Sequence, residues 1–268
     1  MYGGSLHAQV LGPDGAPAIV LLHGSGASTH SWRAVMDLAG SDFRVVALDL
    51  PGHGHSPRQR GARPNLPNVA RAVAQALERL DCAPTCIAGH SAGAAVAVQM
   101  ALSEGVRPAA LVLVNPALAP FPGSSSSLFP ILSGAVFLNP LTTALIARAA
   151  RSTERVRRLL DSTGSVVEPE GLELYRRLLS DPQHVEGTFA MMVHWDLRPL
   201  RRALGQVEPA TLVLVGERDG TVPPEVGRAV AGEIPGARME VFADAGHLLH
   251  EEQPERTWET IRAYLQDL

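Results

Sequence analysis

Short runs of Val, Leu, Ile and Ala recur along the chain, and they constrain its fold more than any other feature. Five of them occupy residues 18–22, 44–48, 85–88, 110–114 and 211–215, and a shorter one occupies 239–242. They do not alternate strictly between apolar and polar residues, which is typical of strands buried on both faces of a parallel sheet. Segments with helical periodicity, such as 68–80 and 92–102, separate them. This order predicts an α/β fold with a mostly parallel central sheet flanked by helices.

The alternation of strands and helices stops near residue 116 and resumes near residue 211. The stretch between them turns helical after the segment FPGSSSS and has no strand-like run of similar quality. We therefore expect residues 1–117 and 205–268 to form one core domain, with residues 118–204 inserted as a helical cap. Residues 6–11 precede a Gly-Pro-Asp-Gly turn and are expected to form an antiparallel edge strand.

The composition excludes several kinds of chemistry and partner. All 23 basic residues are arginine, so a lysine Schiff base, a Ser–Lys dyad and a complete Walker A motif are impossible. The net charge of −4 gives no sign of a nucleic-acid partner. Two cysteines are too few for a disulfide framework, and no signal peptide or membrane-spanning run is evident, so we expect a cytoplasmic protein.

The most specific motif is Gly89-His90-Ser91-Ala92-Gly93, which follows the apolar run at 85–88 and begins the helical segment 92–102. A G-x-S-x-G sequence between a strand and a helix is typical of a nucleophile elbow. This strained turn needs small neighbours and exposes the serine Oγ at the carboxyl edge of the sheet. Ser91 is therefore the candidate nucleophile, and a plain Gly-rich turn is the alternative interpretation.

A serine nucleophile needs a base, and the base needs a carboxylate that orients it. His247 lies in the loop after the last apolar run, where the chain returns to the carboxyl edge of the sheet. Asp219 follows the run at 211–215 and is the candidate carboxylate, with Glu217 as its competitor. The order Ser91, Asp219, His247 along the chain is the one used by folds that carry a nucleophile elbow.

The sequence HGSG at 23–26 follows the first buried run and can supply a further backbone donor. The N–H groups of Ser25 and Ala92 are the candidate oxyanion hole for a tetrahedral intermediate. Another loop, DLPGHGHS at 49–56, carries two histidines two residues apart, but no third ligand stands near them. We expect a structural loop there, and neither a metal nor a cofactor in the protein.

Five motifs together resemble the α/β-hydrolase family across nearly the whole chain: HGSG, DLPGHGHS, GHSAG, VGERD and AGHLLHEEQPE. Within that family, several stretches resemble the accessory α/β-hydrolases of bacteriochlorophyll biosynthesis, which are described as magnesium-chelatase accessory proteins. These stretches are HGSGASTHSW at 23–32, GHSAGAA at 89–95, NPALAPFPG at 115–123, LLDSTGS at 159–165 and MMVHWDL at 191–197. The resemblance implies a link to tetrapyrrole metabolism and magnesium chelatase as a partner, without naming a reaction.

Substrate selection in such a fold is expected to lie in the cap and in the loops at the carboxyl edge of the sheet. The candidates for the substrate pocket are His23, Gly24, His90, Phe121, Phe129, Met191, Met192 and Trp195. The apolar cap members favour an apolar or porphyrin-like small molecule, although an inserted helical layer also needs a core of its own.

An arginine pattern in the cap has two interpretations. Arg148, Arg151, Arg155 and Arg158 are spaced three, four and three residues apart, which predicts one arginine-lined face of a helix. An ordinary solvated face is the first interpretation. The second is an anionic contact with porphyrin propionates, with magnesium chelatase, or with lipid headgroups that would hold the protein peripherally at a membrane.

These residues favour a serine hydrolase that cleaves esters through an acyl-Ser91 intermediate. One alternative is a non-hydrolytic porphyrin-binding accessory protein that keeps the pocket without turnover. Others are a cofactor-free perhydrolase of the haloperoxidase type and a general carboxylesterase, because both use the same triad.

Overall fold

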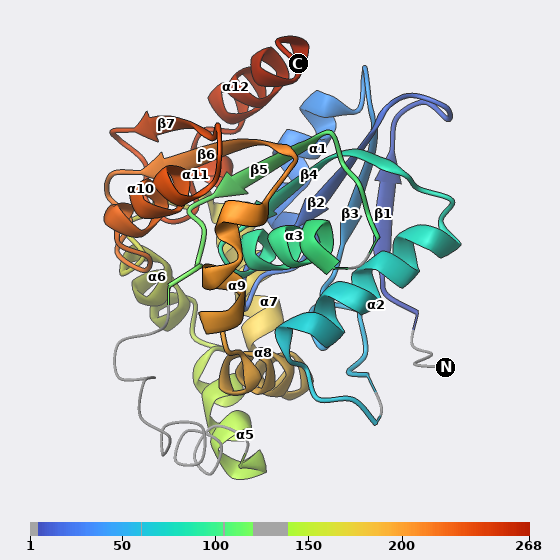
Figure 1. Ribbon diagram of the computed structural model, residues 1–268. Helices are drawn as coiled ribbons and strands as arrows, with labels where there is room; N and C mark the ends of the chain where they lie inside the picture. The colour runs from blue at the N-terminus through green and yellow to red at the C-terminus, as the bar shows by residue number, and fades with distance from the viewer. Residues whose placement is uncertain (1–4, 60, 104, 120–138) are drawn as a thin grey trace.

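The computed structural model describes residues 5–59, 61–103, 105–119 and 139–268. Its centre is a seven-stranded sheet in the order β1-β3-β2-β4-β5-β6-β7 (Figure 1). The strands are β1 (Ala8–Leu11), β2 (Ala18–Leu22), β3 (Arg44–Leu48), β4 (Pro84–His90), β5 (Ala110–Val114), β6 (Ala210–Gly216) and β7 (Arg238–Phe242). Only the edge strand β1 runs antiparallel to its neighbour within this sheet. The predicted α/β fold with a mostly parallel sheet is confirmed.

The largest differences from the predicted strand boundaries, two residues each, are at the end of β4 and the start of β1. β4 continues to His90, because Gly89 and His90 still pair with Leu113 and Val114 of β5. Ser91 therefore follows the last residue of the strand directly, with no loop between them. The edge strand β1 is shorter than predicted and begins at Ala8, opposite Leu48.

Helices cover both faces of the sheet. The helices of the core are α1 (Arg33–Ala39), α2 (Leu66–Arg79), α3 (Ala92–Ser103), α10 (Pro224–Glu233), α11 (Leu249–Glu252) and α12 (Pro254–Gln266). In β2, Val20 and Leu22 face the cluster that contains α2, α3 and α10, whereas Ile19 and Leu21 face the cluster that contains α1 and α12. This double burial is the reason why the strands are apolar without alternation.

The segment between β5 and β6 is helical where the structure describes it. Its helices are α5 (Pro140–Ala149), α6 (Thr153–Asp161), α7 (Pro169–Leu179), α8 (Pro182–His194) and α9 (Arg198–Arg202), on one side of the sheet in Figure 1. Met191 of α8 and Leu200 of α9 belong to the same apolar cluster as one face of the sheet. The division into a core and a cap at residues 118 and 204 stays a prediction.

The prediction of a single arginine-lined helix is wrong. Arg148 lies in α5, Arg151 lies in the turn after it, and Arg155 and Arg158 lie in α6. The helix breaks because its two halves have different packing partners: α5 packs on α8, whereas α6 packs on α7. Ser152, a residue type that favours helix starts, stands at the N-cap of α6.

None of the described helices is both long enough and apolar enough to cross a membrane.

Candidate active site

Ser91 occupies a strained turn between β4 and α3. Its φ is +52°, in the left-handed region that costs a side chain about 1–2 kcal/mol. The turn is held by the Ser91 N–H, which donates to Val114 O at 2.8 Å, and by Ser91 O, which accepts from the N–H of Ala117 at 3.2 Å. The glycines of the motif are required for close approach, since a Cβ on Gly93 would lie 2.3 Å from Leu22 O. This geometry has the form of a nucleophile elbow.

Asp219 and His247 are brought together by the loops after β6 and β7. His247 Nδ1 donates to Asp219 Oδ2 at 2.7 Å, and the side chain of Asp219 is fully buried. Asp219 Oδ1 accepts from the N–H groups of Thr221 at 2.7 Å and Val222 at 2.8 Å. Because the carboxylate can only accept from Nδ1, the neutral ring has an unprotonated Nε2 and can act as a base there. The competing carboxylate, Glu217, pairs instead with Arg228.

Asn115 ties these loops to the sheet beside Ser91. Its side-chain Nδ2 donates to Gly246 O at 3.0 Å and to His247 O at 2.9 Å, while its Oδ1 accepts from Gly216 N at 2.8 Å. Asn115 itself has a φ of +42° and is 3% exposed. Sequence reasoning missed this residue, although a carboxamide directly after a buried strand was an available signal.

His90 joins the elbow to the histidine loop. Its Nε2 donates to His247 O at 2.8 Å, and the two imidazole rings lie 4.6 Å apart. Burial, followed by the neighbouring His250 and His247, holds the pKa of His90 well below its usual value, so the ring is neutral. Ser91 therefore follows a residue that is bonded to the backbone of His247.

The loop after β2 lies directly against the elbow. A Cβ on Gly24 would lie 2.9 Å from His90 Nδ1 and 3.1 Å from Ser91 Cβ, so only glycine fits there. His23 Nε2 accepts from Leu50 N at 2.9 Å, and its Nδ1 donates to Gly24 O at 2.7 Å. Because a trans peptide places C=O and N–H on opposite sides, the Ser25 N–H points away from the His23 ring. Ser25 is exposed, and Ala92 is the first residue of α3.

The turn between α6 and α7 holds the loops that carry Asp219 and His247. Thr163 O accepts from the N–H groups of His247 at 3.2 Å and Gly220 at 3.0 Å, and Ser165 Oγ accepts from Leu248 N at 2.8 Å. These residues belong to the motif LLDSTGS at 159–165, to which no contact with the triad was assigned from sequence. The residues that flank Asp219 and His247 are thus bonded to the same turn.

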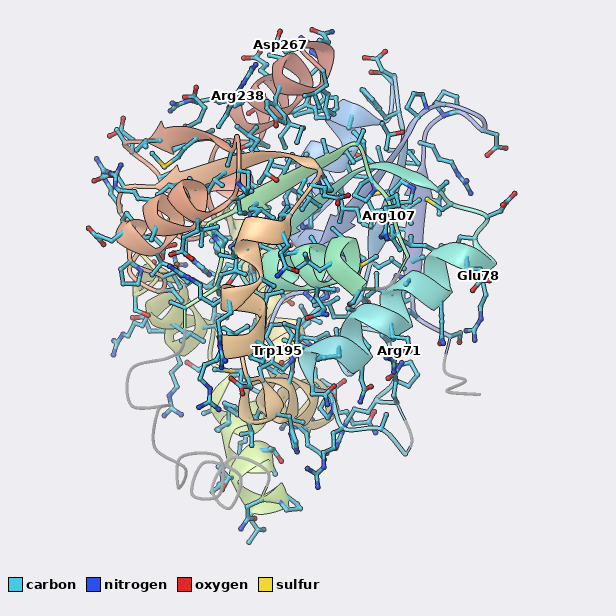
Figure 2. The ribbon with its side chains drawn as sticks, in the orientation of Figure 1. Arg71, Glu78, Arg107, Trp195, Arg238 and Asp267 are labelled. Carbon is cyan, nitrogen blue, oxygen red and sulfur yellow. The ribbon has the colours of Figure 1, made fainter. Side chains whose placement is uncertain are left out.

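The remaining pocket candidates lie in different environments. Met191 is fully buried in the apolar cluster of the sheet, whereas Met192 is 37% exposed. Trp195 donates from Nε1 to Pro64 O at 3.0 Å, beside the start of α2 (Figure 2). Phe121 and Phe129 lie outside the described residues. Their assignment to a substrate pocket stays a prediction.

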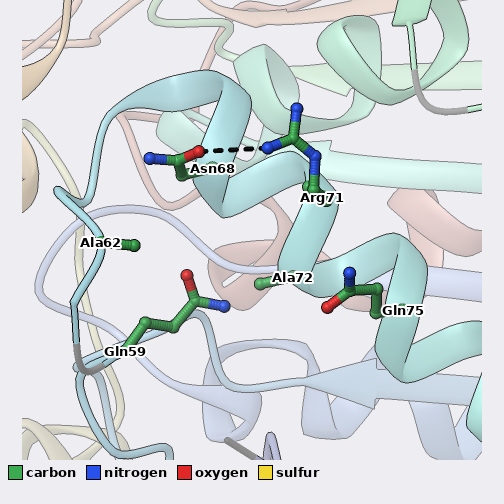
Figure 3. A pocket seen from close by; sticks show the side chains of 6 residues that line it. All are labelled: Gln59, Ala62, Asn68, Arg71, Ala72 and Gln75. Atoms are coloured by element: carbon green, nitrogen blue, oxygen red, sulfur yellow. Dashed lines mark hydrogen bonds between the residues drawn. The ribbon is translucent and has the colours of Figure 1, made fainter. Parts of the chain in front are cut away.

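A pocket beside α2 does not involve the candidate site (Figure 3). Asn68 Oδ1 accepts there from an Arg71 guanidinium nitrogen at 3.4 Å. The other lining residues are Gln59, Ala62, Ala72 and Gln75, and none of them was a predicted site residue.

The two histidines of the 49–56 loop face different neighbours. The His53 ring packs against those of His23 and His184, whereas the His55 ring packs against that of His7. Across residues 5–59, 61–103, 105–119 and 139–268, no group of three or more His, Cys, Asp or Glu side chains could hold a metal ion.

Comparison with known proteins agrees with this geometry. The sequence profile of the "Alpha/beta hydrolase family" matches residues 19–260. The chain belongs to the alpha/beta hydrolase family. A relative of this hydrolase-family chain, the "Magnesium-chelatase 30 kDa subunit" of Rhodobacter capsulatus, is 37% identical over 240 residues, covering 90% of this chain and 84% of that protein. The predicted resemblance to magnesium-chelatase accessory proteins is confirmed.

Solved structures of other alpha/beta hydrolases share the fold. A thermophilic esterase from Thermogutta terrifontis has a TM-score of 0.77 and 27% identity, covering 98% of this chain and 93% of that one. A hydrolase from Pseudomonas aeruginosa has a TM-score of 0.78 and 25% identity, covering 98% and 95%. The predicted α/β-hydrolase fold is therefore confirmed.

Proposed function

We propose that the protein is a serine hydrolase that cleaves carboxylic esters. His247 Nε2 takes the proton of Ser91 as Oγ attacks the ester carbonyl, and the N–H groups of Ser25 and Ala92 bind the oxyanion. The intermediate then expels an alcohol, which takes the proton from His247, and leaves acyl-Ser91. Water, deprotonated by His247, attacks this ester, releases the acid and restores Ser91. The step needs neither a metal nor a cofactor.

The observation that carries the proposal is the buried contact of 2.7 Å between His247 Nδ1 and Asp219 Oδ2. A carboxylate that also accepts two backbone N–H groups has a defined orientation, and it leaves Nε2 of the imidazole as the free base. The elbow with φ of +52° at Ser91 and the close approach of Gly24 to Ser91 Cβ support the same interpretation.

A panel of p-nitrophenyl esters with short and long acyl chains tests this function. We expect an initial burst of nitrophenol followed by steady turnover. Ser91→Ala should lose about 10⁴-fold or more of kcat/KM, since removal of a triad serine costs that much or more. Equal turnover by the wild type and Ser91→Ala would refute the mechanism.

The proposed physiological substrate is an apolar or porphyrin-like ester, and the proposed partner is magnesium chelatase. The support is the 37% identity to a protein named as a magnesium-chelatase subunit. The same similarity favours a second candidate, a non-hydrolytic porphyrin-binding accessory protein. Ser91→Ala in cells that make bacteriochlorophyll distinguishes the two: loss of pigment supports hydrolysis, and normal pigment supports the accessory role.

We also propose a peripheral contact with anionic membrane lipids through α5, the turn after it and the start of α6. Leu141 and Leu145 of α5 are 74% and 67% exposed. Arg148, Arg151 and Arg155 are exposed and form no ion pair with any described acidic side chain. Exposed leucines beside such arginines are typical of a surface that binds an anionic interface.

A further inference from the structure

His184 links the inserted helices to the loop that carries Ser25. It lies on α8, is 1% exposed, and its two ring nitrogens reach different loops of the core. Its Nδ1 accepts from the N–H of Gly54 at 3.0 Å, and its Nε2 lies 3.1 Å from Gly26 O. One imidazole therefore bridges the loop after β3 and the loop after β2.

These contacts determine the tautomer of His184. Its Nδ1 must be unprotonated because a backbone N–H donates to it. Burial lowers the pKa of His184 to about 4, so the ring is neutral near pH 7. A neutral ring with an accepting Nδ1 carries its hydrogen on Nε2, and the Nε2–H therefore donates to Gly26 O.

The glycine carbonyls on both sides of Ser25 are held in this way. Gly24 O accepts from His23 Nδ1 at 2.7 Å, and Gly26 O accepts from His184 Nε2. Gly26 has a φ of +79° and no side chain to restrict it, so an external bond is needed to define its orientation. His23 comes from the core, whereas His184 comes from the inserted segment.

The helix that carries His184 is docked tightly on the core. One turn further along α8, a Cβ on Gly187 would lie 2.0 Å from Gly52 O, so the backbones of helix and loop are in direct contact. A bulkier residue at 187 could not be accommodated without displacing the helix. The His184 ring is thus held on a rigid support.

We propose that His184 is a positioning residue for the oxyanion hole: through Gly26 O it fixes the loop that presents the Ser25 N–H. The proposal rests on the proposed serine-hydrolase function. It makes the docking of α8 a requirement for the rate of acylation, because a displaced donor loses its contact to the oxyanion in the transition state. The ground-state affinity for the substrate depends on other contacts.

Three substitutions at His184 separate its two bonds. His184→Gln places an amide N–H near the position of Nε2 and keeps the bond to Gly26 O. His184→Asn places an amide oxygen near the position of Nδ1 and keeps only the bond to Gly54 N. His184→Ala removes both bonds. Val185→Ala, at a buried neighbour on α8, is the matched control for packing.

The readouts are the rate of Ser91 labelling by a fluorophosphonate probe, kcat and KM for a p-nitrophenyl ester, and the thermal midpoint. We expect kcat and the labelling rate to fall about tenfold or more in His184→Ala and His184→Asn at similar KM, and to recover in His184→Gln. Val185→Ala should stay close to the wild type in both rates, even if its thermal midpoint falls.

The outcomes separate the two proposals. If Ser91 is labelled as fast in His184→Ala and His184→Asn as in the wild type, the positioning role alone is overturned. Equal losses in His184→Gln and His184→Asn would also overturn it, because the bond to Gly26 would then be irrelevant. Absence of Ser91-dependent labelling in the wild type would overturn the proposed function and, with it, this inference.

Discussion

Replacing Gly164 by alanine is expected to separate the inserted segment from the loops that carry Asp219 and His247. Gly164 lies between Thr163 and Ser165. The carbonyl of Thr163 accepts from the N–H groups of His247 and Gly220. Its φ is +79°, and a Cβ there would lie 1.8 Å from Arg218 O. That atom belongs to the backbone, so the overlap cannot be relieved by a side-chain rotation.

The magnitude of this effect has two parts. A left-handed alanine costs about 1–2 kcal/mol, and forcing a methyl group into a packed contact costs about 1–3 kcal/mol more. Gly236 provides the matched control, because its φ is +68° and a Cβ there would have no atom within 4 Å. Gly236→Ala should therefore incur only the first part, and Gly164→Ala should be less stable by a further ~2 kcal/mol.

Urea unfolding followed by circular dichroism measures both free energies, and ester hydrolysis measures the effect on the site. We expect Gly164→Ala to lose more stability than Gly236→Ala, and to lose activity in the molecules that remain folded. Gly236→Ala should keep its activity. Equal free energies of unfolding and equal activities of the two variants would refute the role assigned to this turn.

Three further predictions concern other parts of the molecule. Asn115→Ala removes the side-chain bonds to Gly246, His247 and Gly216. It should lower kcat/KM by about 10²-fold with little change in the pH optimum, since a misplaced base costs that much. An unchanged kcat/KM would contradict this. Burial beside His247 and His30 lowers the pKa of His250 to about 3, below the unfolded value of 6.5, so unfolding takes up a proton and stability falls as the pH falls from 6.5 towards 3. His250→Phe should reduce this slope by roughly 1.4 kcal/mol per pH unit in urea titrations, and an unaltered slope would show that His250 does not titrate in this way. Replacing Arg151 and Arg155 by Glu should abolish sedimentation of the protein with phosphatidylglycerol vesicles at low salt. Phosphatidylcholine vesicles serve as the control. Unchanged sedimentation would exclude this surface as the membrane contact.

The sequence was sufficient for the features that depend on neighbouring residues. The five apolar runs predicted the parallel sheet, and the G-x-S-x-G motif predicted the turn at Ser91, because each depends on residues adjacent in the chain. Asp219 and Glu217 both follow the run at 211–215, so the sequence favoured Asp219 with Glu217 as its competitor, and the structure places Asp219, not Glu217, on His247.

Contacts between distant segments could not be predicted in this way. Asn115 bonds to residues more than 100 positions away, and His184 bonds to a loop 158 positions away. The place of Asn115 after a buried strand marks the residue, but no local pattern identifies the bonding partners of either side chain. The arginine spacing was misleading because periodicity does not show where a helix changes its packing partner. The break after Ala149 follows from the separate docking of α5 and α6.

The most direct test of the central claim is the site of covalent labelling by a fluorophosphonate probe, determined by mass spectrometry of the digested protein. We predict a single phosphonylated residue, Ser91, in the wild type, and strongly reduced labelling in His247→Ala, because the base that activates the serine is then missing. A native protein that stays unlabelled, or a label on another serine that persists in Ser91→Ala, would contradict the triad mechanism.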